Sequence, residues 1–436
     1  MPTRFLVAPS GFKESLPAEE VAAAIAAGIR RVVPGAVVDL VPLADGGEGS
    51  ARTLAAATGG ELVPAVVTGP VGDPVSAHFA ILGGDGPRTG FVEMAAAAGL
   101  RLVPARLRDP GRTTTHGVGE LIAAALDAGC RRIVVGCGDS GTCDGGAGAL
   151  HALGAKFLDA NGTPVRPDGT ALADVVQLDL SGLDERLASA DVVVACNEHN
   201  VLTGPRGVAR VFGAQKGATA DQADSLSATM DHWAKLLEHH CGADLRTAPG
   251  GGASGGLGAG LAGALGARLV PRFEVLPGRA ALAAALPGTD LVLTAEGALD
   301  AQSPSGKVPG EVARQAKRHG KPVIALAGTI GVGARTAHDA GIDAFAGILP
   351  APLSLPEAIA RTAELVTDAT ERTLRLVLLG TALAHGEFRV RMGVNGQCEE
   401  LEAASCVRRE ARPPRPKEPA GSCQAQHERR EQDHRL

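Results

Sequence analysis

The chain has 436 residues, of which 45% are hydrophobic, and its formal net charge is −6 at pH 7. This length is enough for two domains with substantial cores. The negative charge and the scarcity of aromatic residues, with no Tyr and one Trp, argue against a nucleic-acid-binding protein. No unbroken apolar run of about 18 residues predicts a membrane span, and the apolar part of the N-terminus is too short for a signal peptide, so we expect a cytoplasmic protein.

The first part of the chain alternates strands and helices. We expect a strand at residues 5–8, a helix at 17–33 with Ser15 as its N-cap, a strand at 36–41 and a further helix from about residue 50. This order is typical of a parallel sheet, in which ligands bind at the carboxyl ends of the strands.

The alternation of strands and helices changes near residue 65 and returns near residue 290. Short strands separated by turns occupy 65–103, and they are followed by the expected elements helix 117–129, strand 131–136, helix 146–154, strand 192–196 and helix 221–241. Further strands are expected at 290–294, 323–327 and 344–349.

The predicted fold is therefore α/β. We expect a Rossmann-like parallel-sheet domain made of residues 1–64 and 275–385, with a second α/β domain, residues 65–274, inserted into it. Residues 386–436 form a predicted tail, which is rich in Arg, Glu, Gln and Pro from about residue 407 onward. Because such a segment cannot bury enough apolar surface to offset its ordering entropy, we expect this tail to be disordered.

Glycine-rich loops that carry acids or lysines recur after the predicted strands. Such loops bring backbone N–H groups and carboxylates close to an anion, and phosphoryl transfer needs lysines, carboxylates that hold Mg²⁺, and one acid that accepts a proton. The charged candidates are Lys13, Asp45, Glu48, Asp139, Asp144, Lys216, Glu296, Asp300 and Lys307. The segment 250–256, which has five glycines, is a further candidate for binding phosphate through its backbone.

Several familiar motifs occur in misleading contexts. Gly136-x-Gly138-x-x-Gly141 matches a dinucleotide fingerprint, but Asp139, Thr142 and Asp144 stand where its helix should begin. Ser140 and Ser254 lie in contexts that resemble hydrolase nucleophiles, yet no His and Asp partners lie at a recognisable spacing. The sequence contains no P-loop.

Residues 4–383 resemble the glycerate kinase family, in its two-domain bacterial form. The matching stretches include Ala8 to Leu16, Ala44 to Gly49, Val92 to Leu100, Asp144 to Gly148, Asn200 with Leu202 to Gly204, Phe212 to Ala218, Pro249 to Gly258, and Glu296 to Pro309. The resemblance implies ATP-dependent phosphorylation of D-glycerate, with Mg²⁺, in a cleft between the two domains. It leaves open whether the 2- or the 3-hydroxyl is phosphorylated and which loop takes ATP.

From the loops and this resemblance we assign candidate roles. The predicted catalytic residues are Lys13, Asp45, Asp144, Glu296 and Asp300, and Asp45 and Asp144 are the predicted Mg²⁺ ligands. The predicted substrate- and phosphate-binding residues are Gly46, Gly47, Glu48, Ser140, Asn200, Lys216, Gly251, Gly252, Ser254, Gly255, Ser303 and Lys307. A homodimer is the expected assembly, with a small hydroxy acid as substrate and no nucleic-acid or membrane partner.

The chain departs from the family at several positions. It has Ser10 and Asn197 where the family usually has Asp, and His116 and Ala298 where the family usually has Arg. Because Arg binds a carboxylate in a bidentate fork, its loss can change the acceptor. Two alternatives therefore stay open, which are a kinase of a related hydroxy acid and a non-catalytic protein that binds the same ligands. A hydrolase that uses Ser140 or Ser254 is the third.

Overall fold

The computed structural model describes residues 3–385, apart from 13–14, 277, 302 and 304–305. The predicted tail at 386–436 and the predicted catalytic residue Lys13 lie outside the described residues. The described strands form a five-stranded sheet, a six-stranded sheet and a separate two-stranded sheet, which consists of β7 (Lys156–Leu158) and β8 (Gln177–Asp179).

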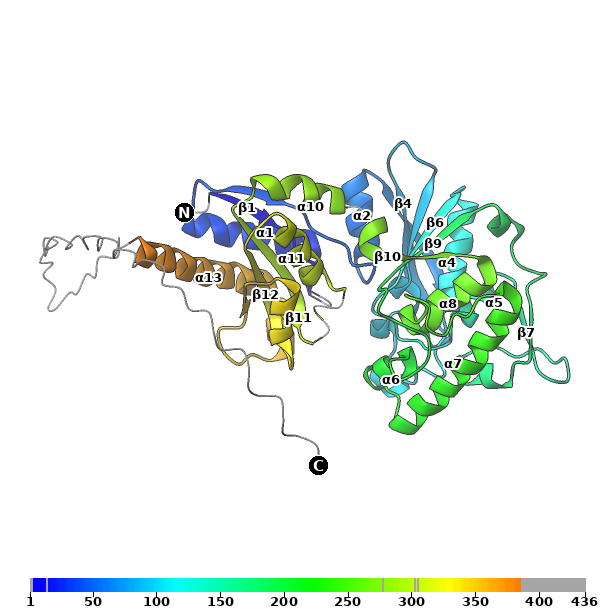
Figure 1. Ribbon diagram of the computed structural model, residues 1–436. Helices are drawn as coiled ribbons and strands as arrows, with labels where there is room; N and C mark the ends of the chain where they lie inside the picture. Colours follow the sequence, from blue (N-terminus) through cyan, green and yellow to red (C-terminus); the bar gives the residue numbers. More distant parts are fainter. Residues whose placement is uncertain (1–2, 13–14, 277, 302, 304–305, 386–436) are drawn as a thin grey trace, which may run out of the picture. The chain divides into compact units, whose positions relative to one another are not determined.

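The first large sheet is parallel throughout and takes its strands from both ends of the chain. In spatial order it contains β13 (Ala344–Gly347), β12 (Val323–Ile330), β11 (Leu291–Leu299), β1 (Arg4–Val7) and β2 (Val37–Leu40). All five strands were expected, and β11 runs several residues further than predicted. Buried side chains on one face pack against α1 (Ala18–Val32) and α13 (Thr362–Ala384), and those on the other face pack against α10 (Arg279–Ala285) and α11 (Val308–Arg318) (Figure 1).

The helix α1 was predicted, but its expected N-cap was wrong. Pro17 is the N-cap residue and makes no side-chain cap bond. The Ser15 hydroxyl instead donates to the Ile359 carbonyl at 3.1 Å and contacts the Thr362 hydroxyl at 2.5 Å. The partners are more than 340 residues away in the sequence, which is why local spacing misassigned this serine.

The second large sheet takes its strands from the middle of the chain. In spatial order it contains β10 (Arg268–Pro271), β9 (Asp191–Cys196), β6 (Arg132–Gly136), β5 (Thr89–Glu93), β4 (Pro74–Leu82) and β3 (Glu61–Thr68). Neighbours from β10 to β5 are parallel, and β4 is antiparallel to β5 and β3.

Helices cover both faces of this second sheet. The face with the larger core packs against α4 (His116–Asp127), α5 (Ala147–Ala152), α7 (Ala220–Cys241) and α8 (Ala253–Leu265). The other face packs against α2 (Ser50–Thr58). The short helices are α3 (Ala95–Ala98), α6 (Val208–Phe212), α9 (Arg272–Val275) and α12 (Leu355–Ala360).

The Rossmann-like sheet with an inserted α/β unit is therefore confirmed as the fold class. The domain boundaries at residues 64 and 274 stay a prediction. Among the residues described, no helix has the length and hydropathy that crossing a membrane requires.

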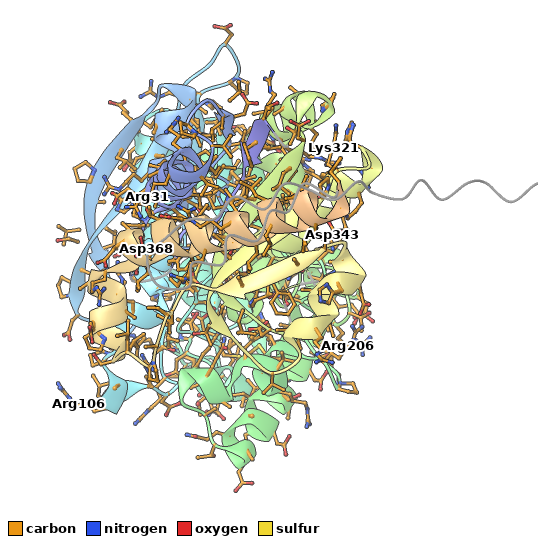
Figure 2. The ribbon with its side chains drawn as sticks, turned by 90° about the vertical axis from the view of Figure 1, so that its left-hand side faces the viewer. Arg31, Arg106, Arg206, Lys321, Asp343 and Asp368 are labelled. Atoms are coloured by element: carbon orange, nitrogen blue, oxygen red, sulfur yellow. The ribbon has the colours of Figure 1, made fainter. Side chains whose placement is uncertain are left out.

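The helices α1 and α13 pack closely along the first sheet. Gly28 of α1 lies so near α13 that an added Cβ would be 2.5 Å from the Thr367 carbonyl oxygen. Beside it, Arg31 forms an ion pair with Asp368 at 2.8 Å, and Figure 2 shows these two side chains next to each other. The pair joins an N-terminal helix to the last described helix.

Candidate functional site

Two adjoining cavities lie where strands of the two large sheets end. The first has a volume of about 500 Å³ and the second about 460 Å³. Four residues line both cavities, namely Ser10, Gly11, Asp45 and Asp139. Ser10 and Gly11 follow β1, Asp45 follows β2, and Asp139 follows β6, so the shared wall is built by loops at the carboxyl ends of parallel strands.

The first cavity brings together most of the predicted charged and polar site residues. Those that line it are Asp45, Ser140, Asn200, Lys216, Ser254, Gly255, Glu296, Asp300 and Lys307. Ser10, Asn197 and Ala298, which are three of the four positions that the resemblance marks as departures, also line it. His116 lines neither cavity.

Lys216 is a buried cation in the wall of the first cavity. It is 3% exposed, and its Nζ donates to Ser140 Oγ at 2.8 Å and to the Thr142 carbonyl at 2.7 Å. Burial lowers the pKa of Lys216 to about 8, an effect that the nearby Cys143 and Asp144 partly oppose. An ammonium group that is held by neutral oxygens and faces a cavity is suited to bind an anion.

A second cation, Lys307, lies in a network of acids at the end of β11. Its Nζ donates to both carboxylate oxygens of Asp300, at 3.1 and 3.2 Å, and lies 3.9 Å from Glu296 Oε2. The Ser303 hydroxyl donates to Glu296 Oε1 at 2.6 Å and accepts the Asp300 N–H at 3.0 Å. Ser303 is fully buried and lines neither cavity, so its contacts are with this network.

The loop after β2 packs directly against the loop after β6. A Cβ at Gly47 would overlap the Asp139 carboxylate and would lie 3.1 Å from Asp45 Oδ1, so only glycine fits between the two acids. Asp45 Oδ1 accepts the Gly47 N–H at 2.9 Å, and Asp139 Oδ2 accepts the Glu48 N–H at 3.1 Å. Gly47 thus serves as a spacer that lets two carboxylates come together, and neither Gly46 nor Gly47 lines a cavity.

The predicted phosphate-binding segment at 250–256 is only partly available to a ligand. The N–H groups of Gly251 and Gly252 donate to the carbonyls of Ala248 and Asn200, at 2.9 and 3.1 Å, and these glycines line neither cavity. Ser254 and Gly255 do line the first cavity, and both have left-handed backbone angles, with φ of 52° and 74°. Successive residues in unusual turn conformations can form an anion-binding concavity.

The carboxylate of Asp144 is occupied by hydrogen bonds within the protein. The residue is fully buried and lines neither cavity, and its carboxylate accepts the N–H groups of Thr115, Gly146 and Gly148 and the Thr115 hydroxyl. Burial raises the pKa of Asp144, whereas these hydrogen bonds oppose the rise. The contacts tie the segment before α4 to the start of α5, so the geometry favours a positioning role over the predicted catalytic and Mg²⁺-binding roles.

Arg272 is a functional candidate that the sequence reasoning missed. It lines the first cavity, is 8% exposed, and donates from Nη1 to the Asp45 carbonyl at 2.8 Å and from Nη2 to the Gly306 carbonyl. Its Nε is buried without a hydrogen-bond partner. Because Arg272 stands in Pro271-Arg272-Phe273, outside any glycine-rich loop, its only sequence signal was a charge directly after the short strand β10.

The second cavity has a different lining. It includes apolar side chains of Phe12, Leu16 and Leu43 and the charged residues Arg52 and Arg101. The predicted residue Glu48 also lines it and pairs with Arg101 at 3.1 Å.

The acids at the shared wall fit a Mg²⁺ ion that is bound together with phosphate. Among the described residues, no group of three or more His, Cys, Asp and Glu side chains is arranged to hold a metal alone. Mg²⁺ is usually bound by one or two carboxylates and completes its shell with substrate phosphates and water. Asp45 and Asp139, which flank Gly47, provide two such carboxylates at the junction of the cavities.

Comparisons with known proteins agree on one family. The model of the Glycerate kinase family matches residues 5–378. A protein of Bacillus subtilis (strain 168) named Glycerate kinase is 44% identical over 387 residues, which are 89% of this chain and 100% of that protein. Glycerate 2-kinase of Escherichia coli (strain K12) is 42% identical over 377 residues, with 86% and 98% covered. A crystal structure described as a glycerate kinase 2 from Salmonella typhimurium LT2 matches with a TM-score of 0.70 at 41% identity, covering 87% of this chain and 100% of that chain.

Proposed function

The chain belongs to the glycerate kinase family, and from this premise we propose that it transfers the γ-phosphoryl group of ATP to a hydroxyl group of D-glycerate. A kinase needs cations that neutralise phosphate charge and an acid at the reacting hydroxyl. The observation that carries the proposal is that Lys216, Lys307 and Arg272 line the same cavity as Asp45.

The charges suggest a division of roles among these residues. Lys216, Lys307 and Arg272 would bind the phosphates or the substrate carboxylate. Asp45, which lines both cavities, would accept the proton of the glycerate hydroxyl as its oxygen bonds to the γ-phosphorus and the bond to the leaving ADP oxygen breaks. Glu296 and Asp300 would orient Lys307.

Asp45 and Asp139 are the residues that would hold Mg²⁺. A bound Mg²⁺ neutralises phosphate charge and aligns the transferring group. The four residues that line both cavities would then surround the point of transfer, with the nucleotide on one side and the acceptor on the other.

A different acceptor is the second candidate. Ser10, Asn197 and Ala298, at which the chain departs from its family, all line the first cavity. If they reshape the acceptor site, a related small hydroxy acid would replace glycerate, and if they remove a required group, the protein would bind its ligands without turnover.

The test measures ADP release from ATP and Mg²⁺ by the purified protein with D-glycerate, L-glycerate, glycolate, tartronate or no acceptor. We expect turnover with D-glycerate alone. Turnover with another acid would move the proposal to that acceptor. If ATP binds, as measured by calorimetry, and no acceptor gives ADP, the protein is a non-catalytic member and the kinase proposal fails.

A cytoplasmic location and a homodimer are also proposed. Both rest on the sequence expectations given above. Sedimentation velocity would test the dimer, and a monomer at all concentrations would contradict it.

A further inference from the structure

Glu93 is a buried acid for which the proposed reaction has no use. It ends β5, is 2% exposed and lines neither cavity. Among the residues that the structure describes, no cation pairs with Glu93, and burying a carboxylate without a cation is costly. The hydrogen-bond partners of Glu93 must therefore explain why this carboxylate is buried.

Its partners are backbone N–H groups at the start of α2. Oε1 accepts the Gly49 N–H at 3.1 Å, and Oε2 accepts the Ala51 N–H at 2.9 Å. Gly49 is the N-cap residue of α2 and has no side chain that could cap the helix. A carboxylate from a strand of the second sheet therefore satisfies the N–H groups that the helix itself leaves open, where the helix dipole favours a negative charge.

These contacts continue a row of carboxylates along one loop. The N–H groups of Gly47, Glu48 and Gly49 are accepted in turn by Asp45, Asp139 and Glu93. The same segment carries Asp45 and Glu48, which line the cavities. Glu93 is the member of this row that holds the far end of the loop from outside the cavities.

The surroundings of Glu93 set its ionisation. Burial raises its pKa to about 7, the two N–H bonds oppose this rise, and the negative charges of Glu48 and Asp139 add to it. On the neighbouring strand β4, His78 faces Arg52 and Arg101, and burial together with these two cations lowers the pKa of His78. Of these two cations, Arg101 pairs with Glu48 at 3.1 Å, so it offsets one of the acids that act on Glu93.

We propose that Glu93 is a positioning residue, and that its ionised carboxylate fixes the backbone from Gly47 to Ala51 so that Asp45 stands correctly for phosphoryl transfer. The proposal rests on the proposed function of the site. It gives Glu93, which stands between the core residues Val92 and Met94, a role that neither substrate contact nor core packing explains.

The main test is Glu93→Gln, which keeps the size of the side chain and removes its charge. The amide can accept one N–H but presents an NH₂ group to the other, so the loop loses one of its two ties. We expect kcat to fall roughly 10- to 100-fold, with a much smaller change in the KM values, since small misplacements of reacting groups cost this much. The thermal midpoint above pH 7 should equal or exceed that of the wild type, because ionising a carboxyl whose folded-state pKa is raised costs stability that Gln does not lose.

Asp168→Asn is the matched control. Asp168 also accepts two backbone N–H groups, those of Thr170 and Ala171 at 3.0 and 2.8 Å, and it lines neither cavity. We expect this variant to keep wild-type kcat. A fall in kcat that is equal in both variants would overturn the proposal.

The pH profile separates positioning from mere stability. Wild-type kcat should rise as the pH rises through about 7, since Glu93 then loses its proton, and this acid limb should be absent from Glu93→Gln. If Glu93→Gln does not fold, Glu93→Asp carries the test, because it keeps the charge and shortens the reach. Glu93→Asp should lose kcat and keep the acid limb, and wild-type kcat in this variant would overturn the proposal.

Hydrogen exchange of the segment 45–54, followed by mass spectrometry, needs no turnover. We expect faster exchange in Glu93→Gln than in the wild type or Asp168→Asn. Unchanged exchange would overturn the positioning role even if the kinase proposal holds. Faster exchange in a protein that phosphorylates no acceptor would support the positioning of the loop and would reject the kinase proposal instead.

Discussion

The ammonium group of Lys216 is held by two neutral oxygens in the wall of a cavity. Its bonds to Ser140 Oγ and the Thr142 carbonyl fix its position, and burial lowers its pKa to about 8. A bound phosphate would provide the negative charge that this buried cation lacks among its direct partners. Ser140, which resembled a hydrolase nucleophile in the sequence, is here a neighbour that orients the lysine.

The first prediction concerns Lys216→Met. Removing a preorganised charge of this kind should lower kcat/KM about 100-fold. In the wild type, kcat/KM should fall as the pH rises through about 8, because the free enzyme then loses the proton that gives Lys216 its charge. Lys235→Met, at an exposed position on α7, is the control and should leave the rates unchanged. Initial-rate kinetics across neutral and alkaline pH measure both effects, and a flat alkaline profile would exclude Lys216 from anion binding.

Single residues of the site were predictable where a charge stood beside glycine. This signal pointed to Asp45, Lys216 and Lys307, which line the first cavity. It missed Arg272 and Glu93, because their roles depend on backbone groups that are distant in the sequence, such as the Gly306 carbonyl and the Ala51 N–H. It also suggested a ligand role for Asp144, whose short-range bonds to Gly146 and Gly148 are those of a buried turn.

At the scale of elements, the end of β10 is tied to two loops of the first sheet. Arg272 follows β10 and donates to carbonyls of the loop after β2 and of the loop before α11. The planar guanidinium can serve two acceptors at fixed angles, which a lysine cannot do. Arg272 therefore holds together loops that carry Asp45 and Lys307.

The second prediction is that Arg272→Lys lowers kcat/KM about 10-fold or more, since one of the two loops loses its anchor. Arg268→Lys, on the strand that directly precedes Arg272, is the matched control. Arg268 forms an exposed ion pair with Asp191, so this change should alter the free energy of unfolding by less than about 1 kcal/mol and leave the rates unchanged. Steady-state kinetics and urea unfolding of both variants provide the comparison, and equal rates in the two would contradict the anchoring role.

The third prediction concerns the packing of α1 against α13. Gly28→Ala should lower the free energy of unfolding by about 1–3 kcal/mol, because its Cβ would collide with backbone and with Thr370. Gly35→Ala, where an added Cβ meets nothing within 4 Å, is the control and should be nearly neutral. Urea unfolding measures the difference. Similar stability of the two variants would show that α1 can shift away from α13 at little cost.

Most elements were predictable because their sequence signals are local. Buried parallel strands such as β6 and β9 read as short apolar runs, and the long helix α7 shows helical spacing around Trp233. The Ser15 cap was wrong because that hydroxyl bonds to groups near α13. The segment at 250–256 was expected to be an open loop. Its second half instead forms the start of α8, and the N–H groups of Gly251 and Gly252 donate to backbone carbonyls.

At the scale of the whole molecule, the site depends on how the chain is divided between two sheets. Asp45 leaves the first sheet, Asp139 leaves the second, and the glycines between them let their loops touch. Local patterns predicted each loop, but the contact between the loops depends on residues about 90 positions apart, and no periodicity reveals it. The expectation of a cleft came from the resemblance to a family, and the residues that line both cavities come from the structure.

The central claim is that phosphoryl transfer occurs where the two cavities meet, at Asp45. The most direct measurement follows ATP, Mg²⁺ and D-glycerate by ³¹P NMR, with the wild type and with Asp45→Asn, whose fold is checked by circular dichroism. We predict a phosphomonoester signal that grows in step with ADP for the wild type, split as a doublet for the 2-phosphate or a triplet for the 3-phosphate. For Asp45→Asn we predict a rate lower by orders of magnitude. Near-normal turnover by Asp45→Asn, or the release of inorganic phosphate in place of a phosphomonoester, would contradict the account.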